Sequence, residues 1–145
     1  MNFKKNLQPV KHTDFGSIAL LLLRLTMGMA FVLHGWGKIQ TPFGWMPEGA
    51  VPVPGFFQFL AAISEFGGGI GLILGLLTPV ASVGIGFTML VATCVHALIF
   101  HDPYVAMAGG GSFEPALGYL MVAIMFLAMG PGRFSLDRAI FGDRT

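Results

Sequence analysis

The stretch Gly55-Phe-Phe-Gln-Phe-Leu-Ala-Ala-Ile-Ser-Glu-Phe-Gly-Gly-Gly-Ile-Gly-Leu-Ile-Leu-Gly-Leu-Leu77 is almost entirely apolar, yet it carries a glutamate, Glu65, near its middle. Its length matches that of a helix that crosses a bilayer, which takes ~20 apolar residues. A charged side chain is costly in hydrocarbon, so such residues usually face the interior of a helix bundle and mark a site or a pathway. Glu65 is therefore the first candidate functional residue.

The composition extends this pattern to the whole chain. Of the 145 residues, 54% are hydrophobic and 10% are charged, whereas a typical soluble domain has about 25% charged residues. The apolar runs predict four membrane spans, at approximately 17–39, 56–77, 80–100 and 115–130. We therefore expect one all-α domain over residues 1–145, an integral membrane four-helix bundle in the lipid bilayer.

The first apolar run also has the features of a secretory signal peptide, because lysines precede it and Gly28-Met29-Ala30 is similar to a cleavage site. Two features favour a retained span instead. Arg24 interrupts the apolar centre, and the apolar run continues to Ile39.

Basic residues predict the orientation of the chain. With four spans, both termini lie on one side of the membrane, and Lys38 alone lies on the other. The terminal side carries Lys4, Lys5, Lys11, Arg133, Arg138 and Arg144. Because cytoplasmic segments are enriched in lysine and arginine, we expect both termini in the cytoplasm and the protein in the bacterial inner (plasma) membrane.

The two outer connections differ in character. Residues 40–54 include four prolines and Trp45, so we expect this segment either to lie in the interface, with Trp45 among the headgroups, or to fold back over the bundle. The second connection, 101–112, contains three consecutive glycines, and its His101-Asp102 pair is interpreted as part of a solvated loop.

Polar residues in the spans fall on shared helix faces, because side chains three and four positions apart are neighbours on a helix. The rise per residue in a helix places His34 and His96 at matching depth on different spans, and Glu65 deeper in the bundle. We predict a periplasm-facing polar pocket whose ligand-binding residues are Arg24, His34, Lys38, Glu65, His96 and Glu114. Within it, Glu65 and His96 are the predicted catalytic residues.

Each of these residues also has a structural interpretation. Arg24 and Glu65 could form an ion pair that fixes helix register without chemistry. Lys38 could extend along the helix to the headgroups, and each histidine could be satisfied by a backbone carbonyl. The glycines at 67, 71 and 75 recur every four residues, which indicates close helix packing.

The order of several motifs resembles the DoxX family of small four-helix membrane proteins, and the resemblance covers nearly the whole chain. The motifs are Arg24 followed by His34-Gly-Trp-Gly-Lys38, then Glu65-Phe-Gly-Gly-Gly, then Leu74-Gly-Leu-Leu-Thr78, then His96, and finally Gly130-Pro-Gly-Arg-Phe-Ser-Leu-Asp137. This family looks related to a group that includes the small DoxD subunit of a thiosulfate:quinone oxidoreductase. The resemblance therefore implies a redox or quinone context, by analogy of fold.

Several chemistries fit the candidate residues. A quinone headgroup needs hydrogen-bond donors such as histidine, and a carboxylate such as Glu65 could relay protons; its tail would lie among Met27, Phe31, Met89 and Met121. Two alternatives are less favoured: a haem between His34 and His96, and a metal held by these histidines with Glu65 and Glu114. No metal ligands are assigned. A dithiol mechanism is excluded for the isolated chain, because Cys94 is its single cysteine.

We expect an inner-membrane subunit of a redox-linked assembly, which would place it among the oxidoreductases. Its partners would be other membrane or peripheral protein subunits, or further copies of the chain. A net charge of +1 with dispersed basic residues argues against nucleic-acid binding. The rival interpretation is a non-enzymatic membrane scaffold or chaperone that holds a partner protein through its glycine-rich helix faces.

Overall fold

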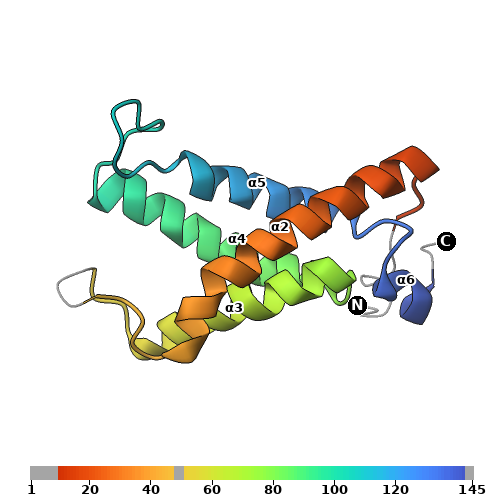
Figure 1. Cartoon of the computed structure of the whole chain (residues 1–145), viewed down its shortest axis with the longest axis horizontal. Coiled ribbons are helices and arrows are strands. Elements are labelled where there is room, and N and C mark those ends of the chain that lie inside the picture. Colours follow the sequence, from red (N-terminus) through yellow and green to blue (C-terminus); the bar gives the residue numbers. More distant parts are fainter. Residues whose placement is uncertain (1–9, 48–50, 143–145) are drawn as a thin grey trace.

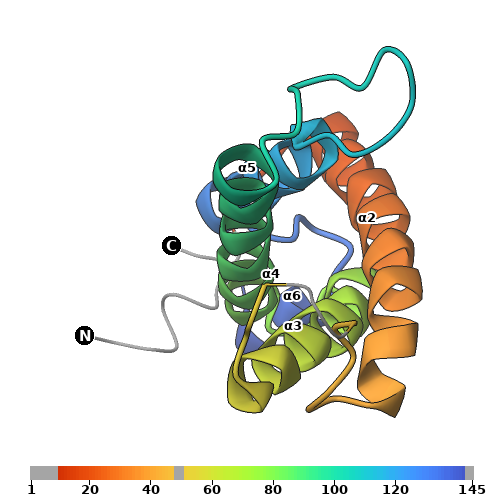
Figure 2. The ribbon, with the colours of Figure 1, turned by 90° about the vertical axis from the view of Figure 1, so that its left-hand side faces the viewer.

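The computed structural model of the chain describes residues 10–47 and 51–142. Every regular element in these ranges is helical, which confirms the all-α prediction. The elements are α2 (Asp14–Gln40), α3 (Gly55–Leu74), α4 (Thr78–Cys94), a π-helical turn η1 (Val95–Ile99), α5 (Glu114–Met129) and α6 (Leu136–Phe141). The four longer helices run side by side around a common interior (Figures 1 and 2).

Among the described residues, three helical segments are long and apolar enough to cross a membrane: α2, α3 and the continuous stretch from Thr78 to Ile99. The fourth, α5, has 16 residues and is therefore about 24 Å long, somewhat shorter than the ~30 Å hydrocarbon core. Large apolar side chains cover the outside of these helices; Leu33, Phe87 and Leu98 are each more than half exposed. This surface is suited to contact with lipid.

Glycines allow α2 and α3 to approach closely. A Cβ atom at Gly28 would lie 2.7 Å from the carbonyl oxygen of Gly69, and one at Gly35 would lie 2.5 Å from the backbone nitrogen of Phe66. Gly28 and Gly35 are not among the glycines that the sequence predicted for close packing, which were 67, 71 and 75. Of those, Gly67 lies on the exposed side of α3. The helices share an apolar core that includes Phe31, Leu72 and Phe126.

The turn between α3 and α4 begins earlier than predicted. Gly75 adopts a left-handed conformation with φ of 63° and ends α3 at Leu74, a conformation that glycine accepts without steric cost. Leu77 is also left-handed, with φ of 49°. Its N–H and that of Thr78 donate to the buried carboxylate of Asp137, at 2.6 and 2.8 Å, so a residue from the far end of the chain caps α4.

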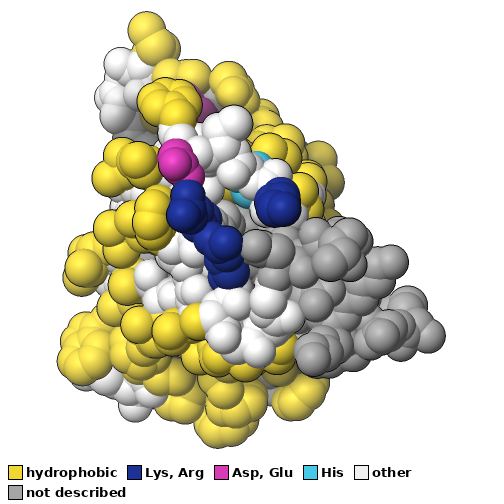
Figure 3. Space-filling view, turned by 90° about the vertical axis from the view of Figure 1, so that its right-hand side faces the viewer, with side chains coloured by type: hydrophobic (Ala, Val, Ile, Leu, Met, Phe, Trp, Pro, Cys, Tyr) yellow, Lys and Arg dark blue, Asp and Glu magenta, His cyan; other side chains and the backbone are white. Residues whose placement is uncertain are grey.

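Both ends of the described chain lie at the same end of the bundle, and the two long connections lie at the other (Figure 1). Lysine and arginine side chains gather at the end that carries the termini (Figure 3). There the exposed Arg133 pairs with Asp14 of α2. Lys4, Lys5 and Arg144, which support the predicted orientation, lie outside the described residues. We refer to this as the terminal end and to the opposite one as the loop end; the cytoplasmic location of the terminal end stays a prediction.

Candidate functional site: a polar cavity at the loop end

A cavity of about 280 Å³ opens at the loop end between α2, η1 and α5. Its lining contains four of the six predicted ligand-binding residues, His34, Lys38, Glu65 and His96. The complete lining is Phe31, His34, Lys38, Glu65, Met89, Ala92, His96, Ser112, Pro115, Ala116 and Tyr119. Residues from all four long helical segments thus meet at one site.

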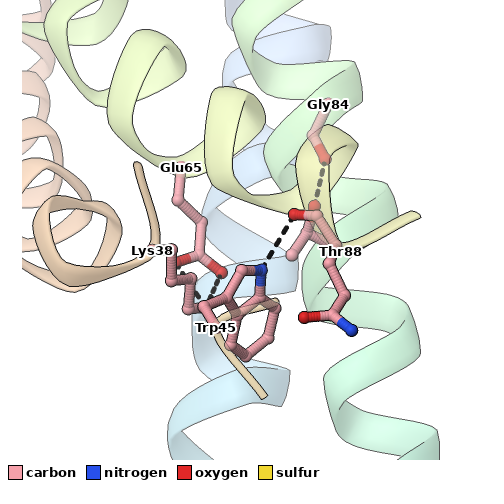
Figure 4. Close-up of polar contacts among 6 residues, drawn as sticks. Lys38, Trp45, Glu65, Gly84 and Thr88 are labelled. Atoms are coloured by element: carbon pink, nitrogen blue, oxygen red, sulfur yellow. Dashed lines mark hydrogen bonds and ion pairs between the residues drawn. The ribbon is translucent and has the colours of Figure 1, made fainter. Parts of the chain in front are cut away.

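Glu65 and Lys38 form an ion pair at this cavity. The Lys38 ammonium lies 2.6 Å from Oε1 and 2.7 Å from Oε2 of Glu65, and the Glu65 side chain is 1% exposed. Figure 4 shows the lysine turned inward to the carboxylate. The interpretation in which Lys38 extends to the headgroups is therefore wrong, because a buried carboxylate requires a partner of opposite charge.

The connection between α2 and α3 folds back over this ion pair. The Lys38 ammonium lies 4.5 Å from the centre of the Trp45 ring, a distance typical of cation–π contacts. The Trp45 indole N–H donates to the backbone carbonyl of Gln58 at 2.9 Å, and the Gln58 side chain accepts from the N–H of Met46 at 3.0 Å. These contacts of Trp45 and Met46 agree with the expected arrangement in which the segment folds back over the bundle.

His96 lies in the π-helical turn η1, a distortion that is frequent at functional sites. Its Nδ1 lies 2.6 Å from Oδ2 of Asp102, and the Asp102 N–H donates to the His96 carbonyl at 2.9 Å. His101-Asp102 lies in a loop as expected, with His101 exposed, but Asp102 is not merely solvated, because it bonds His96. The spacing of six residues hid this contact, because residues six apart do not share a face of a regular α-helix.

Tyr119 of α5 also lines the cavity, although no sequence pattern predicted it. Its ring centre lies 5.2 Å from that of Phe31 and 6.1 Å from that of His34. These aromatic contacts connect α5 to α2 across the cavity. A lone tyrosine in an apolar helix carries no signal of such a role, because the same pattern occurs in ordinary cores.

Two predicted ligand-binding residues lie away from the cavity lining. Arg24 is fully buried and donates through Nη2 to the carbonyl oxygen of Phe134, close to Gly75. It therefore holds the C-terminal segment at the terminal end and does not pair with Glu65, which is paired with Lys38. Glu114 begins α5, where its side chain is exposed.

The residues predicted around a ligand tail are divided in the same way. Phe31 and Met89 line the cavity, whereas Met27 packs against the apolar core and Met121 is 49% exposed on the outside of α5. Within residues 10–47 and 51–142, no three histidine, cysteine, aspartate or glutamate side chains are grouped closely enough to hold a metal ion. Cys94 is free and exposed.

The fold and this site define a small, multi-pass helical membrane protein with a polar cavity at one end. A sequence model of the DoxX family matches residues 19–102, and the chain belongs to the DoxX family. This confirms the resemblance seen in the motifs.

Three relatives from different bacteria match most of the chain. The inner membrane protein YqjF of Escherichia coli K12 is 33% identical over 129 residues, which cover 85% of this chain and 92% of YqjF. The "Putative oxidoreductase CatD" of Bacillus subtilis 168 is 30% identical over 86% of this chain and 88% of its own length. The "Uncharacterized membrane protein Rv3486" of Mycobacterium tuberculosis H37Rv is 30% identical over 86% and 83%.

No solved structure matches the chain. Together, the membrane-length helices and the inner membrane relative identify a multi-pass protein of the bacterial inner membrane.

Proposed function

We propose that the cavity binds the ring of a quinone-type molecule and that the protein is an inner-membrane subunit of a redox-linked assembly. The observation that carries this proposal is the convergence, in one apolar-walled cavity, of the Lys38–Glu65 ion pair with His96. These groups supply hydrogen-bond donors, an acceptor and a site for protons beside a hydrocarbon phase.

The chemistry of the lining suits a ring that carries oxygen atoms. The Lys38 ammonium has three N–H donors, of which two point to the Glu65 oxygens, so one remains for a ligand oxygen. Tyr119 and His34 add further polar groups to the lining, and Phe31 supplies an apolar face. A bound quinone would supply the redox chemistry, while these residues orient its ring and hold protons.

The size of the cavity favours a single ring over a larger group. A volume of about 280 Å³ is at the lower edge of the range of about 300–1,000 Å³ that is typical of ligand pockets. A haem macrocycle is much larger than one ring. The lipid tail of a quinone would leave the cavity toward the bilayer, where the apolar outer faces of the helices are exposed.

The name of the CatD relative contains the word oxidoreductase, which agrees with a redox context for this chain. The proposed catalytic residues are Glu65, as the proton-relaying carboxylate, and His96, as the group that bonds the ligand oxygen. The other ligand-binding residues that we retain are His34 and Lys38. Arg24 and Glu114 are left out, because neither lines the cavity.

Tryptophan fluorescence tests this proposal. Decylubiquinol, whose hydroxyl groups can bond His96, is titrated into the Trp36→Phe protein in detergent, so that the remaining Trp45, which lies over Lys38, reports binding by quenching. We expect Glu65→Gln and His96→Ala each to weaken binding at least about tenfold, the effect of losing one good hydrogen bond. Glu114→Gln is the matched control and should bind normally. Equal affinity in all these variants would refute the proposal.

An open groove on the surface supports the scaffold function as a second candidate. This groove, of about 400 Å³ between α3 and α4, has Gly67, Gly71 and Gly84 in its lining. It would accept a helix of another membrane protein, because small residues allow close approach. Gly67→Leu tests it better than Gly71→Leu, since a Cβ at Gly71 would already lie 3.0 Å from the Leu76 carbonyl oxygen. Copurified proteins that persist in Gly67→Leu would count against it.

A further inference from the structure

We propose that Asp102 is a positioning residue that fixes the tautomer of His96, so that the cavity selects the reduced, hydroxyl-bearing form of its ligand. This inference rests on the proposed function, because it takes the ligand to be a quinone-type ring. Its first part, the tautomer of His96, concerns this chain alone and can be tested without a ligand.

The argument begins with the contact between the two side chains. Nδ1 of His96 lies 2.6 Å from Oδ2 of Asp102. An ionised carboxylate can only accept hydrogen bonds, so Nδ1 must carry the proton. In the neutral imidazole the other nitrogen, Nε2, then has a lone pair and is an acceptor. Nε2 has no hydrogen-bond partner among the described residues, and His96 lines the cavity.

The backbone holds this arrangement in place. The π-helical turn is followed by His101 with φ of 54°, which turns the chain back so that the Asp102 N–H donates to the His96 carbonyl. Gly111 lies against the carboxylate, since a Cβ there would be 2.5 Å from Oδ2. The pair is therefore bonded twice, and a side chain at Gly111 would have to displace the Asp102 carboxylate.

The other polar groups around the cavity determine what His96 would recognise. Lys38 of α2 is bonded to Glu65 of α3, while His34 of α2 and Tyr119 of α5 line the same cavity. A hydroxyl group on the ligand can donate to Nε2 of His96, whereas a carbonyl group cannot. At a pH where the imidazole is neutral, the site should therefore bind a quinol more tightly than the corresponding quinone.

The first measurement uses no ligand. The protein is labelled with ¹⁵N-histidine, and the imidazole nitrogen shifts are recorded at alkaline pH, with the His96 signals assigned by their loss in His96→Gln. We expect the Nδ1–H tautomer in the wild type and a shift toward Nε2–H in Asp102→Asn, which can donate to Nδ1. An Nε2–H tautomer in the wild type, or identical spectra in both proteins, would overturn the positioning role.

The second measurement compares decylubiquinol with decylubiquinone by quenching of Trp45 at the same pH, with every protein in the Trp36→Phe background. We expect the wild type to bind the quinol about tenfold more tightly and Asp102→Asn to lose this preference. Asp14→Asn, which changes an exposed aspartate at the terminal end, should keep it. Equal binding of both forms by the wild type would overturn the selection. If neither form binds, the proposed function fails, while the tautomer result still decides the role of Asp102.

Discussion

At the scale of single residues, the Lys38–Glu65 pair shows why a charge in a membrane helix needs a specific partner. Glu65 is 1% exposed and both of its oxygens contact the same ammonium. Burial makes each charge expensive to leave unpaired. Trp45 adds a cation–π contact to the same ammonium, whose nitrogen lies 4.5 Å from the ring centre.

Replacing Lys38 by methionine tests this dependence. Lys38→Met keeps the length of the side chain but leaves a buried carboxylate without its partner, so the free energy of unfolding should fall by on the order of 3 kcal/mol. Unfolding in mixed micelles with increasing SDS measures it. The double variant Lys38→Met, Glu65→Gln should recover part of the loss, and Lys11→Met, at an exposed position, should lose none. Full stability of Lys38→Met would show that the pair contributes nothing.

At the scale of elements, the contact between α2 and α3 depends on backbone approach. Gly28 and Gly69 face each other closely enough that a Cβ at Gly28 would lie 2.6 Å from Ile73 Cγ1 and 2.7 Å from the Gly69 carbonyl oxygen. This contact positions Lys38 and Glu65, because they lie on these two helices. His96 lies in a different kind of element, a π-helical turn in which no residue is buried.

Two alanine substitutions with opposite expected signs test this view of the helices. Gly28→Ala should lower the free energy of unfolding by about 1–3 kcal/mol, the usual cost of overpacking. Gly118→Ala in α5 meets no atom within 4 Å and should raise stability by up to about 1 kcal/mol, because alanine favours a helix over glycine. The SDS unfolding assay compares them directly. A neutral Gly28→Ala would mean that the two helices can separate without cost.

At the scale of the whole molecule, the C-terminal segment closes the terminal end of the bundle. Asp137 caps α4, and its own N–H donates to the Gly75 carbonyl at 2.8 Å. Arg24 holds Phe134 of the same segment. The polar cavity and this closed end lie on opposite sides of the apolar core around Phe31, so the cavity opens at the loop end and not at the terminal end.

Cysteine labelling tests which side of the membrane that entrance faces. In a Cys94→Ser background, Met107→Cys places a thiol in the outer loop, where Met107 is 92% exposed. Lys11→Cys places one at the terminal end. The bias of basic residues predicts that a membrane-impermeant maleimide labels Met107→Cys in intact spheroplasts and labels Lys11→Cys after permeabilisation. The reverse pattern would invert the assigned topology.

The sequence by itself determined the membrane helices and most of the cavity lining. Apolar length identifies a span because hydrocarbon demands it, and helical periodicity placed His34 and Lys38 on one face because the repeat is local. Tertiary structure decided which groups these side chains bond. Arg24 bonds Phe134, and His96 bonds Asp102 through a non-α turn, since such contacts depend on chain reversals and interhelical distances that no local periodicity encodes.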